Sequence, residues 1–245
     1  MATFVDYVNK IIFITSPKCG TTTISAYLNS PLNLEYKNKY EIENNNNTNL
    51  FLDNTFTNII IYREDIIDRF LSGFYEDLFN NSCYNNVDVT FDQYLSFLHY
   101  CSVNKIPNLN NMNTYLNKDI PIWFGNCSYR KLNITDDTGT FISHIQSQSY
   151  GILYILNTIN EYKCKKVKII ELNDLNKIIP NEKYNVKNKS KHNINLSNTL
   201  VCDLKKNNII CSKKCLTDKH IELILEIYKE DIDLIHNLKN NYEYY

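Results

Sequence analysis

Residues 11–28, IIFITSPKCGTTTISAYL, predict a strand, a tight turn and a helix in immediate succession. The continuous apolar run at 11–14 is typical of a strand that is covered on both faces. Residues 16–20 are expected to form the turn, and three threonines open the helix. The helix is expected because apolar residues recur at helical spacing, at Ile24, Tyr27 and Leu28.

The start of this helix offers a site for an anion. Its first amides have no partner within the helix, and the helix dipole places about half a positive charge there. The ammonium of Lys18 adds charge, and hydroxyls come from Thr21, Thr22 and Thr23. We therefore expect the turn to bind a phosphorylated nucleotide. The alternative interpretation is an ordinary strand, turn and helix that carries a lysine by chance.

A second strand and helix repeat this layout at residues 58–79. The apolar run at 59–62 predicts the strand, and Arg63 comes at its end. Asp65 or Asp68 is expected to cap the helix. Its apolar face is formed by Phe70, Leu71, Phe74, Tyr75 and Leu78. Arginine suits phosphate binding because its planar guanidinium meets two phosphate oxygens at once.

The turn differs from a Walker A loop, in which the lysine follows the second glycine of Gly-x-x-x-x-Gly-Lys. Here Lys18 comes two residues before Gly20. The order Pro17-Lys18-Cys19-Gly20-Thr21-Thr22 instead resembles the 5′-phosphosulfate loop of sulfotransferases that use 3′-phosphoadenosine-5′-phosphosulfate (PAPS). The resemblance implies that residues 17–23 bind the 5′ side of this nucleotide.

The second segment is similar to the family's 3′-phosphate motif, which implies that Arg63 and Ser72 hold that phosphate. The family's proline is missing here, and the spacing from Arg63 to Ser72 is one residue longer. We interpret Arg69 as a solvated or structural helix residue. In the family a late loop closes over the nucleotide phosphates, so Lys189 and Lys191 are candidates for that loop, and a solvated surface loop is the alternative.

Three later elements resemble the carbohydrate branch of the same family. Residues 144–149 are similar to its His-x-x-x-Gln-Ser element, and residues 167–175 to a strand with a Glu-x-x-x-Leu helix start. Residues 216–235 predict an amphipathic helix, capped by Thr217 or Asp218. Its expected apolar face comprises Ile221, Ile224, Leu225, Tyr228 and Ile232. The resemblance implies a carbohydrate hydroxyl as acceptor and a glycan as partner.

The implied reaction is in-line transfer of a sulfuryl group, for which a protein mainly positions groups and neutralises charge. Lys18 is the candidate for charge on the leaving phosphate, and with the helix start it makes a metal unnecessary. Family members place a histidine or glutamate base between the two nucleotide motifs, where this chain offers Glu41 among its acidic residues. His144 is the other candidate base, because imidazole titrates near neutral pH. A structural role for His144 is the alternative.

The expected fold class is α/β, a P-loop-like three-layer α/β/α arrangement with a central mostly parallel sheet. A length of 245 residues suits one domain over 1–245, with an irregular insertion around 104–140 that we expect to contribute to acceptor binding. The net charge of −1 gives no strong field to attract nucleic acid.

The chain has no apolar run long enough to span a bilayer, so we expect no membrane segment and favour a soluble cytoplasmic protein. The Golgi lumen is the alternative if a leader has been removed. Among eight cysteines, Cys19 is expected to remain a thiol within the phosphate loop. Cys202 and Cys211 flank an apparent β-hairpin and are candidates for a disulfide across it. A zinc site from Cys211, Cys215 and His220 is an alternative, but its spacing matches no strong ligand pattern.

Two other classes of function stay open. One is a P-loop nucleotide kinase or hydrolase that uses ATP and magnesium. The other is a non-catalytic module that binds a glycan or 3′-phosphoadenosine-5′-phosphate (PAP), the nucleotide product of sulfuryl transfer.

Overall fold

The computed structural model describes residues 2–16, 18–29, 54–80, 90–103, 147–149, 152–153, 156–157, 166–179 and 191–244. The chain forms two compact units. Unit 1 comprises Met1–Glu64, Ser147–Lys187 and Glu230–Tyr245, and unit 2 comprises Asp65–Gln146 and Asn188–Lys229. The predicted insertion at 104–140 lies outside the described residues. That both units belong to one domain stays a prediction.

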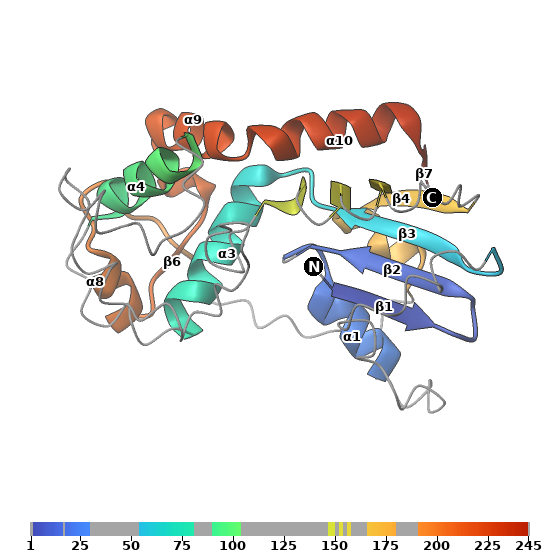
Figure 1. The fold of residues 1–245 in the computed structure, drawn as a ribbon. Helices are drawn as coiled ribbons and strands as arrows, with labels where there is room; N and C mark the ends of the chain where they lie inside the picture. Colours follow the sequence, from blue (N-terminus) through green and yellow to red (C-terminus); the bar gives the residue numbers. More distant parts are fainter. Residues whose placement is uncertain are drawn as a thin grey trace. The chain divides into compact units, whose positions relative to one another are not determined.

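Among the described residues, unit 1 is built on a sheet of five strands in the order β1-β2-β3-β4-β7. The strands are β1 (Ala2–Asp6), β2 (Ile11–Thr15), β3 (Thr57–Tyr62), β4 (Val167–Glu171) and β7 (Glu243–Tyr244). Of these described strands, β1 runs antiparallel to β2, and the pairs β2–β3, β3–β4 and β4–β7 are parallel. Figure 1 shows β1 to β4 side by side in this order. The prediction of a mixed α/β fold with a mostly parallel sheet, flanked by helices, is confirmed.

Burial on both faces explains why the strands read as continuous apolar runs. On one face, Ile24 and Leu28 of α1 (Thr21–Asn29) belong to the same buried cluster as Phe13, Ile59 and Ile170 of the central strands. The alternate strand residues are also fully buried, at Ile12, Ile14, Ile60 and Ile169. Since successive side chains of a strand point to opposite faces, both faces of the sheet are covered.

A hairpin places β1 beside β2, a strand that the sequence did not predict. Asp6 is fully buried at its end and accepts hydrogen bonds from the amide and the side chain of Asn9, at 2.8 and 2.9 Å. Lys10 completes the turn with φ 55°. The buried aspartate therefore fixes the turn that begins β2.

Unit 2 is mostly helical. Its elements are α3 (Ile66–Asn80), α4 (Phe91–Val103), β5 (Lys191–His192), α8 (Val201–Lys206), β6 (Ile210–Cys211), η6 (Lys213–Cys215) and α9 (Asp218–Ile227), with β5 and β6 parallel. The five residues predicted for the apolar face of α3 are all buried. Asp65 caps this helix, because its Oδ1 accepts the amide of Asp68 at 2.9 Å. Asp65 also binds Lys213 and raises the pKa of that lysine.

Aromatic rings from three helical segments form the core of unit 2. Phe74 of α3 contacts Phe91 of α4 edge to face, with ring centroids 5.4 Å apart, and Tyr94 at 5.2 Å. Phe70 lies 6.2 Å from the ring of Tyr228 at the end of α9. Aromatic pairs of this kind stabilise the fold beyond the gain from apolar burial, and they prefer particular ring arrangements.

The helix predicted at 216–235 is two helices, α9 and α10 (Lys229–Asn241), which meet at Tyr228. Thr217 caps α9, as predicted. The expected apolar face is wrong in part, because Leu225 and Ile232 are 38% and 39% exposed. The buried positions instead follow helical spacing through polar residues, at His220, Ile224, Tyr228, Asp231, Leu234, Ile235 and Leu238.

The hairpin expected between Cys202 and Cys211 is also wrong. Cys202 lies in α8, which ends where Asn208 takes the left-handed conformation with φ 51°. The amide of Ile209 then donates to Leu204 at 2.8 Å, which satisfies a carbonyl at the helix end. Cys202 and Cys211 are both thiols, and so is Cys19, as predicted. In the described parts of the chain, the helices are all too short or too polar to cross a bilayer.

Candidate anion-binding site

The loop after β2 is a tight turn that uses unusual backbone conformations. The amide of Cys19 donates to the carbonyl of Ser16 at 3.1 Å, and the hydroxyl of Thr15 donates to the carbonyl of Cys19 at 2.5 Å. Lys18 has φ 66° and Gly20 has φ 92°. A lysine in the left-handed region costs about 1–2 kcal/mol, so the surrounding turn must hold it there. The side chain of Lys18 is half-buried.

Helix α1 begins directly after this turn, as predicted. The amide of Ile24 donates to the carbonyl of Gly20 at 2.9 Å, so Gly20 is the N-cap position. By helix geometry, the amides of the three preceding threonines at 21–23 lie before that first bond. Thr22 is exposed, its two neighbours are half-buried, and the first turn contains no acidic residue. The positive end of the dipole is therefore available to an anion.

Arg63 lies at the neighbouring strand end. Strands β2 and β3 are parallel, with Thr15 paired to Ile61, so the turn and Arg63 follow the carboxyl ends of adjacent strands. The side chain of Arg63 is half-buried. In open α/β sheets, ligands bind outside this edge. The structure thus brings together the predicted turn, the start of α1 and Arg63.

Gln148 links the turn to Arg63, a role that the sequence did not predict. Its Nε2 donates to the carbonyl of Arg63 and its Oε1 accepts the Arg63 amide, both at 3.0 Å. The same Oε1 lies 3.4 Å from the thiol of Cys19, and the hydroxyl of Ser16 donates to the Gln148 carbonyl at 3.1 Å. Gln148 is fully buried. The only signal in the sequence was its place in the element at 144–149.

The third strand end is arranged by Glu171. The predicted strand and helix start are confirmed as β4 and a 3-10 helix, η5 (Leu172–Lys177). Glu171 caps η5 by accepting the amide of Asn173 at 2.5 Å. Its other oxygen lies 3.4 Å from the amide of Glu64, the residue after Arg63. Glu64 in turn forms an ion pair with Lys239 of α10 at 2.5 Å.

The described structure does not test whether the remaining predicted site residues lie at this edge. Ser72 is half-buried on α3 of unit 2, whereas Arg63 belongs to unit 1. Pro17, Glu41, His144 and Lys189 lie outside the described residues, and Lys191 is described only by its backbone in β5. Their roles stay predictions.

Arg69 is a structural residue of α3, and the solvated alternative is wrong. Its side chain is fully buried in unit 2. The guanidinium carbon lies 5.4 Å from the centroid of the Tyr228 ring, a cation–π contact.

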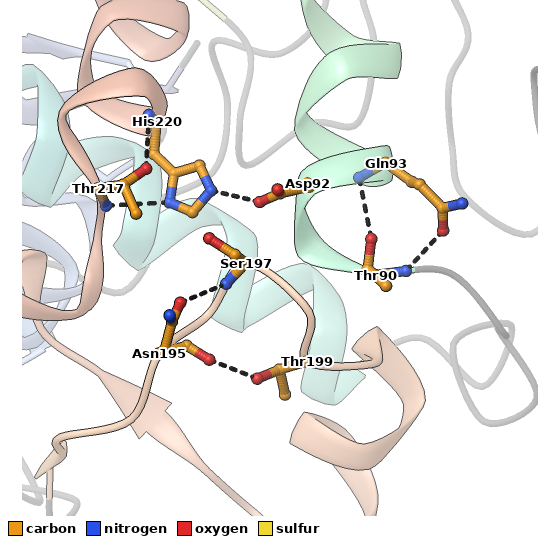
Figure 2. Close-up of polar contacts among 8 residues, drawn as sticks. All are labelled: Thr90, Asp92, Gln93, Asn195, Ser197, Thr199, Thr217 and His220. Atoms are coloured by element: carbon orange, nitrogen blue, oxygen red, sulfur yellow. Dashed lines mark hydrogen bonds and ion pairs between the residues drawn. The ribbon is translucent and has the colours of Figure 1, made fainter.

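A buried histidine in unit 2 bears on the zinc alternative. Figure 2 shows His220 between Thr217 and Asp92. Its Nδ1 accepts the Thr217 amide at 3.2 Å, so Nε2 carries the hydrogen that it donates to Asp92 at 2.5 Å. With both nitrogens engaged, the ring has no lone pair for a metal. Across the described residues, no group of three or more His, Cys, Asp or Glu side chains is arranged to hold a metal ion.

The other contacts of Figure 2 are local caps and turns. Thr90 and Gln93 exchange backbone-to-side-chain hydrogen bonds at the start of α4, at 2.9 and 3.3 Å. Asn195 accepts the amide of Ser197 at 3.0 Å and the hydroxyl of Thr199 at 2.7 Å. These are the usual means of satisfying backbone groups at helix starts and turns. They indicate a structural role for this cluster.

Three features thus meet at the carboxyl edge of the unit 1 sheet. They are the turn around left-handed Lys18, called the lysine turn below, the start of α1 and Arg63. Comparison with known proteins gives no match to this chain among protein-family models, curated proteins or solved structures.

Proposed function

We propose that this protein is a PAPS-dependent sulfotransferase that transfers a sulfuryl group to an acceptor hydroxyl, with a carbohydrate as the acceptor class. The proposal includes the three-layer α/β/α arrangement of P-loop-like proteins. The observation that carries it is the placement of the lysine turn and Arg63 at the ends of two adjacent parallel strands. The resemblance of residues 17–22 to the 5′-phosphosulfate loop supplies the identity of the nucleotide.

The donor groups at this edge fit the charges of the nucleotide. PAPS carries a phosphosulfate on its 5′ side and a separate phosphate on its 3′ side. A helix start with no acid in its first turn suits the first group, because backbone amides and the dipole favour negative charge. A strand-end arginine suits the second, because its fork can bind two phosphate oxygens.

The proposed roles follow from these positions. PAPS would supply the sulfuryl group. The Lys18 ammonium and the donors of Thr21, Thr22 and Thr23 neutralise charge on the 5′-phosphate as it leaves. Cys19 and Gly20 shape the turn, and Pro17 is assigned to it from the sequence. Because these groups are fixed before the reaction, the protein pays little reorganisation when charge develops.

The other roles rest on the sequence resemblance. Arg63 and Ser72 are proposed to bind the 3′-phosphate, and Lys189 and Lys191 to close over the phosphates. Glu41 and His144 are the two candidate bases for the acceptor proton. The carbohydrate acceptor rests on the elements at 144–149, 167–175 and 216–235.

The test is calorimetric titration of the wild-type protein and an Arg63→Ala variant with PAP, and separately with ATP and magnesium. Lys166→Ala is the matched control, because this exposed lysine precedes β4 at the opposite edge of the sheet. We expect PAP to bind more tightly than ATP. Loss of one charge-assisted contact should weaken PAP binding by about 10- to 100-fold in Arg63→Ala and leave Lys166→Ala unchanged.

Other outcomes identify the alternatives. Binding of ATP and magnesium without PAP binding would favour a nucleotide kinase or hydrolase. PAP binding without sulfuryl transfer from PAPS to any of a broad panel of sugars, phenols and peptides would favour a non-catalytic module. Where the wild type does transfer the sulfuryl group, Lys18→Ala tests the transferase directly, since it should lose turnover far more than acceptor binding.

A further inference from the structure

Two buried side chains, Gln148 and Asp231, form a chain of hydrogen bonds that leads to the candidate anion-binding site. Gln148 bonds to both backbone groups of Arg63 and to the Cys19 thiol, and its carbonyl accepts the Ser16 hydroxyl. One residue therefore contacts both the turn after β2 and the residue after β3. The Gln148 side-chain amide pairs with the backbone N–H and C=O of Arg63, directly after β3 ends.

Asp231 of α10 holds Gln148 in turn. Its Oδ2 accepts the amide of Gln148 at 2.9 Å, and its Oδ1 accepts the amide of Ser149 at 2.8 Å. The hydroxyl of Ser147 also donates to Oδ1. Gln148 and Ser149 have helical backbone, so the carboxylate lies against amides of a helix start, where negative charge is favoured. Asp231 is fully buried.

The burial of these groups argues for a specific role. Placing a carboxylate and a primary amide in the interior costs free energy unless each is hydrogen-bonded, and apolar side chains would fill the same space more cheaply. Here the bonds of both lead to the same place, the edge that carries Arg63 and the lysine turn. An anion site gains from such rigidity, because donors that are already oriented lose little entropy on binding.

We propose that Gln148 is a positioning residue that sets the backbone of Arg63 against the Lys18 turn, and that Asp231 acts through Gln148. This inference rests on the proposed function. It assigns neither residue contact with the nucleotide or the sugar. Nucleotide affinity then depends on two buried side chains that act through the backbone of Arg63.

The experiment measures PAP affinity and urea stability for Gln148→Met, Asp231→Asn, Arg63→Ala and the double variant Gln148→Met/Arg63→Ala. Asp6→Asn is the matched control. Asp6 is also fully buried in unit 1 and accepts bonds from the Asn9 amide, the Asn9 side chain and the Tyr27 hydroxyl. It pairs with Ile11, at the other end of β2 from the lysine turn.

Gln148→Met and Asp231→Asn should each weaken PAP binding about tenfold, as expected from one or two lost hydrogen bonds. Asp6→Asn should lower the urea midpoint about as much as Gln148→Met and Asp231→Asn do. It should leave PAP affinity unchanged. In the double variant the loss should be smaller than the product of the single losses, because Gln148 acts in part through Arg63. If Gln148→Met does not fold, Gln148→Asn replaces it in both measurements. This variant keeps the amide on a shorter side chain.

The outcomes separate this inference from the proposed function. If the wild type fails to bind PAP, both are overturned. If the wild type binds PAP and Arg63→Ala weakens binding while the Gln148 and Asp231 variants bind as wild type, only the positioning role is overturned. Fully multiplicative losses in the double variant would also contradict it, since they would show that Gln148 and Arg63 act independently.

Discussion

Gly20 lies so close to Leu172 that a Cβ at position 20 would be 2.9 Å from the Leu172 Cδ1. The same atom would lie 3.1 Å from Cδ2 of Leu175. The lysine turn therefore packs directly on η5, the helix that follows β4. Since Gly20 also has φ 92°, both its backbone conformation and its surroundings require glycine.

Gly20→Ala should accordingly lower the free energy of unfolding by about 2 kcal/mol, from left-handed strain together with overpacking. Urea denaturation measures the change. In a Leu172→Ala background the contact with Leu172 is removed and the strain remains, so the cost of Gly20→Ala should shrink by about half. An undiminished cost in that background would show that the contact with Leu172 contributes nothing.

Lys18 should show a conflict between stability and binding. Replacing it with glycine relieves the strain of φ 66° and should raise the free energy of unfolding by about 0.5 kcal/mol, after the added entropy of the unfolded chain. Lys18→Ala keeps the strain and should leave stability nearly unchanged. Both variants lose the ammonium, so both should bind PAP at least about tenfold more weakly.

Asn208→Gly is the control for this pair, because Asn208 has φ 51° in unit 2 and carries no charge. It should leave PAP affinity at the wild-type value. Stability comes from urea denaturation and affinity from calorimetry. Equal PAP affinity of wild type, Lys18→Ala and Lys18→Gly would remove Lys18 from the proposed site.

The sequence predicts the parts of unit 1 that rest on local pattern. The runs at 11–14 and 59–62 are apolar at every position except the last, Tyr62, because their strands are buried on both faces. The turn and Arg63 follow these strands in the chain, and parallel pairing places them at one edge. This much of the site follows from strand order alone.

Residues that depend on distant partners escape such patterns. His220 is buried on α9 and Asp231 on α10. Their burial is possible because each has hydrogen-bond partners far away in the chain. Hydropathy alone instead favoured Leu225 and Ile232, which are exposed. Gln148 is similar, since a glutamine that bonds to the backbone of Arg63 leaves no local signature.

The segment between Cys202 and Cys211 is short and polar, and its sequence does not distinguish a hairpin turn from a helix end. Asparagine in the left-handed conformation occurs both in hairpin turns and at helix ends. The residues between Cys202 and Cys211 suit either, and Asn208 ends a helix here. The burial of Val201 and Leu204, three residues apart, decides for the helix.

His220 should stabilise unit 2 through its hydrogen bonds to Thr217 and Asp92. His220→Ala removes the acceptor of the Thr217 amide and the bond to Asp92, so the free energy of unfolding should fall by about 3 kcal/mol. Asp92→Asn keeps an acceptor but loses its charge and should cost about 1 kcal/mol. Glu222→Gln, an exposed position on α9, is the control. A loss of stability on adding a metal chelator to the wild type would contradict the structural role.

Cys211 makes stability depend on pH in the alkaline range. Burial raises the pKa of its thiol from 9.0 to about 11, and burial also raises that of Tyr75, whose hydroxyl accepts the Cys211 amide. Between pH 9.0 and about 11, the unfolded chain releases the Cys211 thiol proton while the folded protein keeps it. The free energy of unfolding should therefore be highest below pH 9.0 and fall as the pH rises toward about 11. Urea denaturation across this range should show a shallower fall for Cys211→Ala than for wild type or for the half-buried control Cys202→Ala. Identical slopes in all three proteins would mean that Cys211 ionises alike in the folded and unfolded chain.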